Sequence, residues 1–85
     1  MERYKIKFTK NATKDYMKLP YSYKALIDTV LYKLSEGKNI DLKPVIGEKN
    51  TYRIRVGGYR ILFLKEDMLI LITRIAPRGD AYKKK

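Results

Sequence analysis

The stretch from residue 51 to residue 64 constrains the fold most, because it contains two β-strand patterns joined by Gly57-Gly58. Residues 51–56 alternate between apolar and polar side chains, as expected of a strand with one buried face. Two glycines between such segments favour a two-residue hairpin turn, because glycine readily adopts a positive φ. This turn fixes the pairing of the strands, with Val56 opposite Tyr59, Arg55 opposite Arg60, Ile54 opposite Ile61 and Arg53 opposite Leu62.

The predicted hairpin places Arg55 and Arg60 directly across from each other on one face. Like charges in such positions destabilise a sheet by a few tenths to about 1 kcal/mol. An anion held between the two guanidinium groups would turn this repulsion into attraction. The pair therefore indicates either a phosphate-binding face or a solvated face on which the side chains splay apart.

A third strand is predicted over residues 68–75, after a turn at residues 65–67. Its side chains are almost all apolar up to Arg74, as in a strand that is covered on both faces or poorly exposed. A change of one residue in the turn would reverse every side chain, so the pattern leaves the face of Arg74 open. Pro77 ends the strand because it has no N–H for the ladder, and Arg78 follows.

The first half of the chain predicts one strand and two helices. Residues 3–8 alternate and form a strand at a sheet edge, where lysines deter aggregation. Thr9 is the expected N-cap of a short helix over residues 10–19, and a longer helix follows over residues 21–36. Residues 39–50 are expected to be a loop. The helical faces expected to be buried carry Ala12, Tyr16, Leu19, Ala25 or Leu26, Ile27, Val30, Leu31 and Leu34.

The predicted order is therefore β-α-α-β-β-β, a two-layer α+β sandwich in which a helical hairpin covers one face of a three-stranded antiparallel meander. The helices would cover the face of Ile54 and Ile61 and leave the arginines on the open face. We expect residues 1–85 to form a single domain, with residues 83–85 as a disordered basic tail.

The composition limits the possible functions. The formal net charge is +11, which favours a polyanion or an acidic protein as partner, with nucleic acid as the leading choice. The chain has no histidine or cysteine, so it lacks the commonest acid–base group and the usual ligands of a metal site. No apolar run approaches the length of a membrane span, and we expect a cytoplasmic protein that does not bind membranes.

Three segments, FTKNATKDYMKLP, YRIRVGGYRILF and ITRIAPRGDAY, resemble the RelE/ParE superfamily of toxins from toxin–antitoxin systems. The resemblance covers nearly the whole chain and is closest to the RelE-type messenger-RNA interferases. It implies a RelE-like fold and cleavage of messenger RNA in the ribosomal A site, without a metal or other cofactor. In that chemistry the RNA's own 2′-hydroxyl attacks the adjacent phosphate and leaves a cyclic phosphate.

The resemblance also implies which residues act and which molecules bind. The catalytic candidates are Arg55, Arg60, Arg78 and Tyr82, and the candidates for RNA phosphate binding are Arg53, Arg74 and Lys83. Guanidinium groups bind phosphate through two parallel hydrogen bonds and can stabilise the charge of a transition state. The expected partners are the ribosome, messenger RNA and a RelB-like antitoxin that is acidic or amphipathic.

The general base remains open. Family members often carry lysines on the strand before the turn, where this chain has Arg53 and Arg55. Arginine, with a pKa above about 12, cannot take the proton from the hydroxyl. Tyr82, whose pKa nearby arginines would lower, is the first candidate, and Glu48 and Asp80 are alternatives.

Two other functions compete with RNA cleavage. One is non-enzymatic inhibition of DNA gyrase, as in toxins of the ParE type. The other is simple binding of nucleic acid by a basic module, which predicts steep salt dependence and no cleavage.

Overall fold

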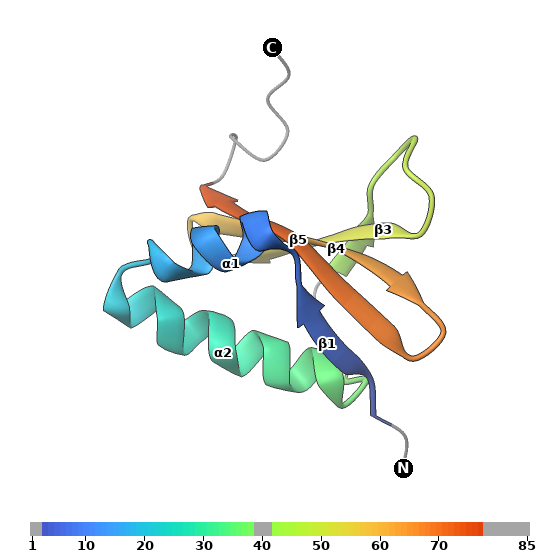
Figure 1. The fold of residues 1–85 in the computed structure, drawn as a ribbon, viewed down its shortest axis with the longest axis horizontal. Coiled ribbons are helices and arrows are strands. Elements are labelled where there is room, and N and C mark those ends of the chain that lie inside the picture. The colour runs from blue at the N-terminus through green and yellow to red at the C-terminus, as the bar shows by residue number, and fades with distance from the viewer. Residues whose placement is uncertain (1–2, 39–41, 78–85) are drawn as a thin grey trace.

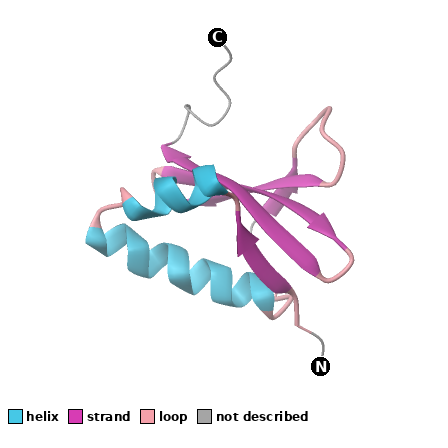
Figure 2. Ribbon diagram, viewed as in Figure 1, coloured by secondary structure: helices cyan, strands magenta, loops and turns pink. Residues whose placement is uncertain are grey.

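The computed structural model describes residues 3–38 and 42–77, which form one sheet with two helices on one of its faces (Figures 1 and 2). This arrangement confirms the predicted two-layer α+β class. The elements in chain order are β1 (Lys5–Phe8), α1 (Lys10–Met17), α2 (Tyr21–Ser35), β2 (Leu42–Pro44), β3 (Thr51–Val56), β4 (Tyr59–Glu66) and β5 (Leu69–Pro77).

The strands lie side by side in the order β1-β5-β4-β3-β2. Strands β2 to β5 are antiparallel neighbours, and β1 runs parallel to β5 at the edge of the sheet, where an edge strand was predicted. The prediction of a loop over residues 39–50 was wrong in part, because β2 pairs with β3 and places Pro44 opposite Tyr52. A three-residue strand that contains a proline carries no alternating pattern by which to recognise it.

The hairpin of β3 and β4 has the predicted register, with Arg55 opposite Arg60 and Val56 opposite Tyr59. Of the two turn glycines, Gly57 has the positive φ, +58°. The side chains of Ile54 and Ile61 point to the helices and are almost completely buried, at 2% and 0% exposure. The arginines on this hairpin consequently occupy the opposite face, as predicted.

A β-bulge at Thr73 determines the orientation of the end of β5. Leu62 pairs with Arg74 but Phe63 pairs with Ile72, so Thr73 is an extra residue on its strand. Its hydroxyl donates a hydrogen bond to the carbonyl of Leu62 at 3.2 Å. Because the extra residue reverses the alternation, Ile72 lies on the helix-covered face and Arg74 lies on the opposite one.

Of the two alternatives expected for β5, coverage on both faces is wrong, because the helices cover one face only. Ile70 and Ile72 are buried beneath the helices, whereas Leu69 is 37% exposed and Leu71 is half-buried. Within residues 3–38 and 42–77, both helices lie on the face of Ile70 and Ile72, so no helix covers the face of Leu69 and Leu71 (Figure 1).

The two helices begin and end close to the predicted residues. The hydroxyl of Thr9 accepts a hydrogen bond from the N–H of Ala12 at 3.0 Å, which confirms the N-cap of α1. Gly37, with φ +71°, follows the end of α2. The prediction that Ala25 or Leu26 is buried was wrong, since both are exposed and α2 turns Ile27 towards the sheet instead. Neither described helix is long and apolar enough to cross a membrane.

Candidate phosphate-binding face

The face of the sheet opposite the helices carries four arginines from three neighbouring strands. Residues directly across from each other share a face, so one row contains Arg55, Arg60 and Ala76, and the next contains Arg53, Leu62 and Arg74. We call this surface, defined by Arg53, Arg55, Arg60 and Arg74, the arginine face. The register answers the question that the sequence left open, because the β-bulge places Arg74 in the row of Arg53, from which its side chain reaches to α1.

The arginines differ in exposure. Arg55 and Arg74 are exposed, whereas Arg53 and Arg60 are half-buried. Neighbouring strands lie about 4.8 Å apart, so the guanidinium groups of one row are within reach of a single phosphate. Four cations on a rigid sheet, in place before any ligand arrives, suit binding and charge stabilisation of a phosphodiester.

Arg74 is held by an acidic side chain of α1. The Oδ2 atom of Asp15 accepts a hydrogen bond from Nε of Arg74 at 2.8 Å and another from the backbone N–H of Ile75 at 2.9 Å. This contact occupies one of the five guanidinium N–H groups and fixes the position of the arginine. No sequence pattern indicated this role of Asp15, although it is the only acidic residue between Thr9 and Leu19.

The turn between Arg55 and Arg60 is anchored to α2. The hydroxyl of Tyr23 accepts a hydrogen bond from the N–H of Gly58 at 2.9 Å. The ring of Tyr23 also packs against Tyr59, with 4.6 Å between ring centroids. No local sequence pattern indicated this contact, which joins residues 35 positions apart.

The remaining candidates fall into two groups. Arg78, Asp80, Tyr82 and Lys83 lie outside the described residues, so their roles, and the expected basic tail at 83–85, stay predictions. Glu48 is exposed in the turn between β2 and β3. Within the described ranges, no three acidic side chains gather into a group that suits a metal ion.

Comparison with known proteins finds relatives that are all toxins of the same kind. The family model described as the ParE toxin of type II toxin–antitoxin systems, parDE, matches residues 6–82. A protein of Methanocaldococcus jannaschii with the provisional name toxin RelE1 is 31% identical over 87 residues, which cover 95% of this chain and 97% of the relative.

Two solved structures show the same fold. A chain of the RelBE2 toxin–antitoxin complex of Mycobacterium tuberculosis is 30% identical with a TM-score of 0.78, over 89% of this chain and 99% of that one. A chain of the RelB–RelE complex of Methanococcus jannaschii is 27% identical with a TM-score of 0.80, over 93% and 98%. The family model matches most of the chain and the relatives share its fold, and the chain therefore belongs to the RelE/ParE superfamily of toxins from type II toxin–antitoxin systems.

Proposed function

We propose that this toxin is an endoribonuclease that cuts messenger RNA in the ribosomal A site. The observation that carries the proposal is the placement of Arg55 directly opposite Arg60, on a face that also holds Arg53 and Arg74. Such a concentration of like charge is unfavourable by itself, and a bound phosphodiester makes it favourable. The proposed site of action is the cytoplasm, where translating ribosomes present the RNA.

The proposed reaction needs no atom from outside the RNA. The 2′-oxygen attacks the adjacent phosphorus, the bond from phosphorus to the 5′-oxygen breaks, and the products are a 2′,3′-cyclic phosphate and a 5′-hydroxyl. Negative charge grows on the phosphoryl oxygens during the attack. Arg55, Arg60 and Arg78 are proposed to stabilise this charge, and removal of one well-placed donor typically costs about 3–4 kcal/mol of activation free energy.

Proton transfer is assigned to residues other than the arginines. A base must accept the proton of the 2′-hydroxyl, and an acid must protonate the leaving 5′-oxygen. Tyr82 is the proposed base, with Glu48 and Asp80 as alternatives, since arginine keeps its proton. Arg53, Arg74 and Lys83 are proposed to hold flanking phosphates, which would place the reacting groups in line.

The proposed neutralising partner is a RelB-like antitoxin with acidic or amphipathic segments. Two similar structures are complexes that contain both a toxin and an antitoxin. The net charge of +11 adds a physical reason, because opposite charge accelerates association and gives it a strong salt dependence.

Primer extension on a defined messenger RNA tests the proposal, with stalled ribosomes present in one reaction and absent in the other. We expect cuts at the A-site codon only with ribosomes, and about a hundredfold or greater loss of rate for Arg55→Ala or Arg78→Ala. Lys33→Ala, which removes one positive charge from the exposed side of α2, is the matched control and should cut normally. Normal cleavage by both arginine variants would overturn the site assignment.

Inhibition of DNA gyrase is the second candidate function, because the matching family model is that of the ParE toxins. A supercoiling assay with purified gyrase distinguishes the two. Loss of supercoiling together with intact messenger RNA would favour inhibition of gyrase over RNA cleavage.

A further inference from the structure

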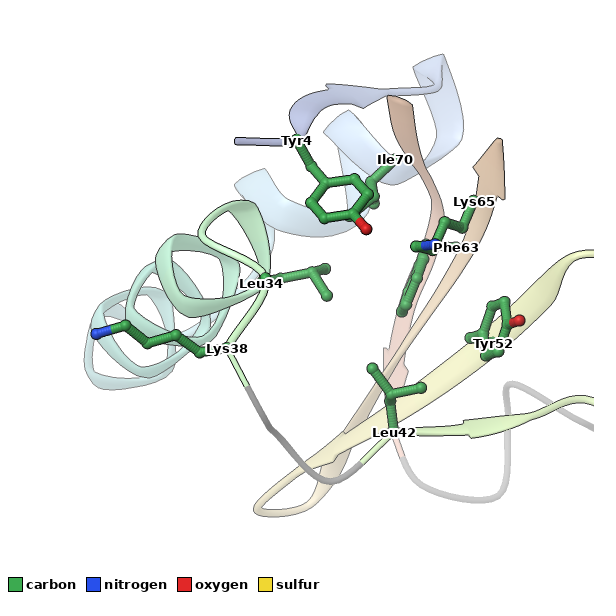
Figure 3. Close-up of a pocket in the computed structure, with 9 residues that line it drawn as sticks. Tyr4, Leu34, Lys38, Leu42, Tyr52, Phe63, Lys65 and Ile70 are labelled. Atoms are coloured by element: carbon green, nitrogen blue, oxygen red, sulfur yellow. The ribbon is translucent and has the colours of Figure 1, made fainter. Parts of the chain in front are cut away.

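A cavity of about 280 Å³ lies beside the C-terminal end of α2, over the helix-covered face of the sheet (Figure 3). Its floor is apolar and sealed, since Phe63 and Ile70 are 0% and 1% exposed. Figure 3 shows the side chains of Leu34 and Leu42 pointing into the same space. Clefts for small-molecule ligands measure roughly 300–1,000 Å³, so this cavity suits one or two inserted side chains.

Among the described residues, the charged side chains that line the cavity are two lysines. The ammonium group of Lys65 lies 5.0 Å from the ring centroid of Tyr4. The ammonium group of Lys38 pairs instead with Glu36 at 3.3 Å and is turned away from the cavity (Figure 3). Lys65 is therefore the cation that a ligand in the cavity would meet, and it favours a ligand with a negative group.

The aromatic walls favour an aliphatic or aromatic side chain over a nucleobase. Base recognition in single strands depends on open ring faces for stacking. Here Tyr52 already stacks on Phe63, with 5.7 Å between centroids, and Tyr4 already holds the ammonium of Lys65. A base would have to displace one of these contacts. None of the buried residues in the described part of the chain is polar, so the floor formed by Phe63 and Ile70 offers no side chain for reading the base edge.

We infer that this cavity is an anchor site for an acidic polypeptide segment, which inserts an apolar side chain between Leu34, Leu42 and Phe63 and places a neighbouring carboxylate on Lys65. The inference rests on the proposed function in one respect, because the antitoxin is the partner that would supply such a segment. The adjacent edge strand β2 ends in Pro44, which lacks an N–H for strand addition. Side-chain insertion is therefore the main source of affinity at this site.

The test is a titration of the ¹⁵N-labelled full chain with short peptides, followed by amide chemical shifts. The probe is N-acetyl-Glu-Phe-Glu-amide, for which we expect a Kd on the order of a millimolar. Shift changes should cluster at Gly37, Leu42, Tyr52 and Lys65. The Glu-Ala-Glu peptide should bind about tenfold more weakly because it lacks the apolar side chain, and the Lys-Phe-Lys peptide about two- to fivefold more weakly.

Two variants separate the cavity from the general charge of the protein. Lys65→Met keeps an apolar stem and should weaken binding of the Glu-Phe-Glu peptide about two- to fivefold. Lys38→Met removes the same charge at a side chain that points elsewhere and should change binding less. Equal effects of both variants, shift changes confined to the arginine face, or stronger perturbation of the cavity by uridine 5′-monophosphate would each overturn the inference.

This experiment is independent of RNA cleavage. Under the proposed function, Arg55→Ala should slow cleavage about a hundredfold or more but leave peptide binding unchanged. If the peptide binds as expected and no RNA is cut, the proposed activity fails and the anchor site stands. If RNA is cut and the peptide does not bind at the cavity, the inference about the cavity fails alone.

Discussion

The hydroxyl of Tyr23 accepts a hydrogen bond from the N–H of Gly58, at 2.9 Å, and so joins α2 to the turn that separates Arg55 from Arg60. The same hydroxyl lies 2.6 Å from the position that a Cβ atom would take on Gly57. A side chain at Gly57 is therefore disfavoured for two reasons, the positive φ and the nearby hydroxyl of Tyr23. Neither reason applies to a side chain at Gly58.

Gly57→Ala should destabilise the protein more than Gly58→Ala. Alanine at a φ of +58° costs about 1–2 kcal/mol, and Tyr23 must also move. At Gly58 the new Cβ would be 3.6 Å from the hydroxyl, an ordinary contact, so we expect little change. Urea unfolding followed by circular dichroism measures both. Equal stability of the two variants would contradict the turn geometry.

Tyr23→Phe should cost about 0.5–1 kcal/mol, because the exposed hydrogen bond to Gly58 is lost while the packing on Tyr59 remains. The phenylalanine also removes the atom closest to a Cβ at Gly57. The double variant with Gly57→Ala should therefore be more stable than the sum of the single effects predicts. Additive free energies of unfolding would show that the hydroxyl is not the obstacle.

Asp15→Ala should destabilise the protein by about 1–2 kcal/mol, since it leaves the N–H of Ile75 without its acceptor and removes the partner of Arg74. Asp15→Asn keeps an acceptor oxygen and should cost less. Glu48→Gln, at an exposed turn, is the control for loss of one acidic charge. Thermal unfolding of the three variants ranks their stabilities. A larger loss of stability in Glu48→Gln than in Asp15→Ala would contradict the role of Asp15.

Because Arg55 lies directly opposite Arg60, we expect the stability of the protein to depend on which anion is present. Arg55→Thr should stabilise the protein in chloride buffer by a few tenths to about 1 kcal/mol, because a like-charge contact is removed. Replacing chloride by phosphate at constant ionic strength should raise the Tm of the wild type more than that of the variant, since phosphate binds the folded pair. Identical shifts would argue against an anion site.

We expect the ionised carboxylate of Glu36 to stabilise the folded protein at neutral pH and to lose this effect in acid. Its pKa is lowered from 4.5, mainly by a side-chain hydrogen bond from Tyr32 and then by Lys38 and Arg3. A lowered pKa in the folded state adds stability above pH 4.5, and this is lost as the pH falls through the folded value. Glu36→Gln should therefore be less stable than the wild type near pH 7, with a difference that shrinks below pH 4.5. A constant difference would contradict the assignment.

Local patterns predicted the hairpin register, because the turn between Val56 and Tyr59 and the alternation beside it leave one arrangement. They could not predict the bulge at Thr73, which lies in an apolar run with no change of periodicity. The resemblance supplied the identities of the arginines but no contacts. Asp15 and Tyr23 were missed because their roles depend on how the helices pack against residues 59 and 35 positions away.

Because β5 lies between β1 and β4, the sheet cannot be completed until the end of the chain has been synthesised. Ribosomes make the chain from its N-terminus, yet Lys5 pairs with Leu69, 64 residues later. The α1 helix likewise lies against β5 and holds Arg74 through Asp15. Contacts of such high sequence separation form late. The toxin can therefore complete its arginine face only after β5 has left the exit tunnel, so an unfinished chain still on the ribosome does not yet carry the complete face.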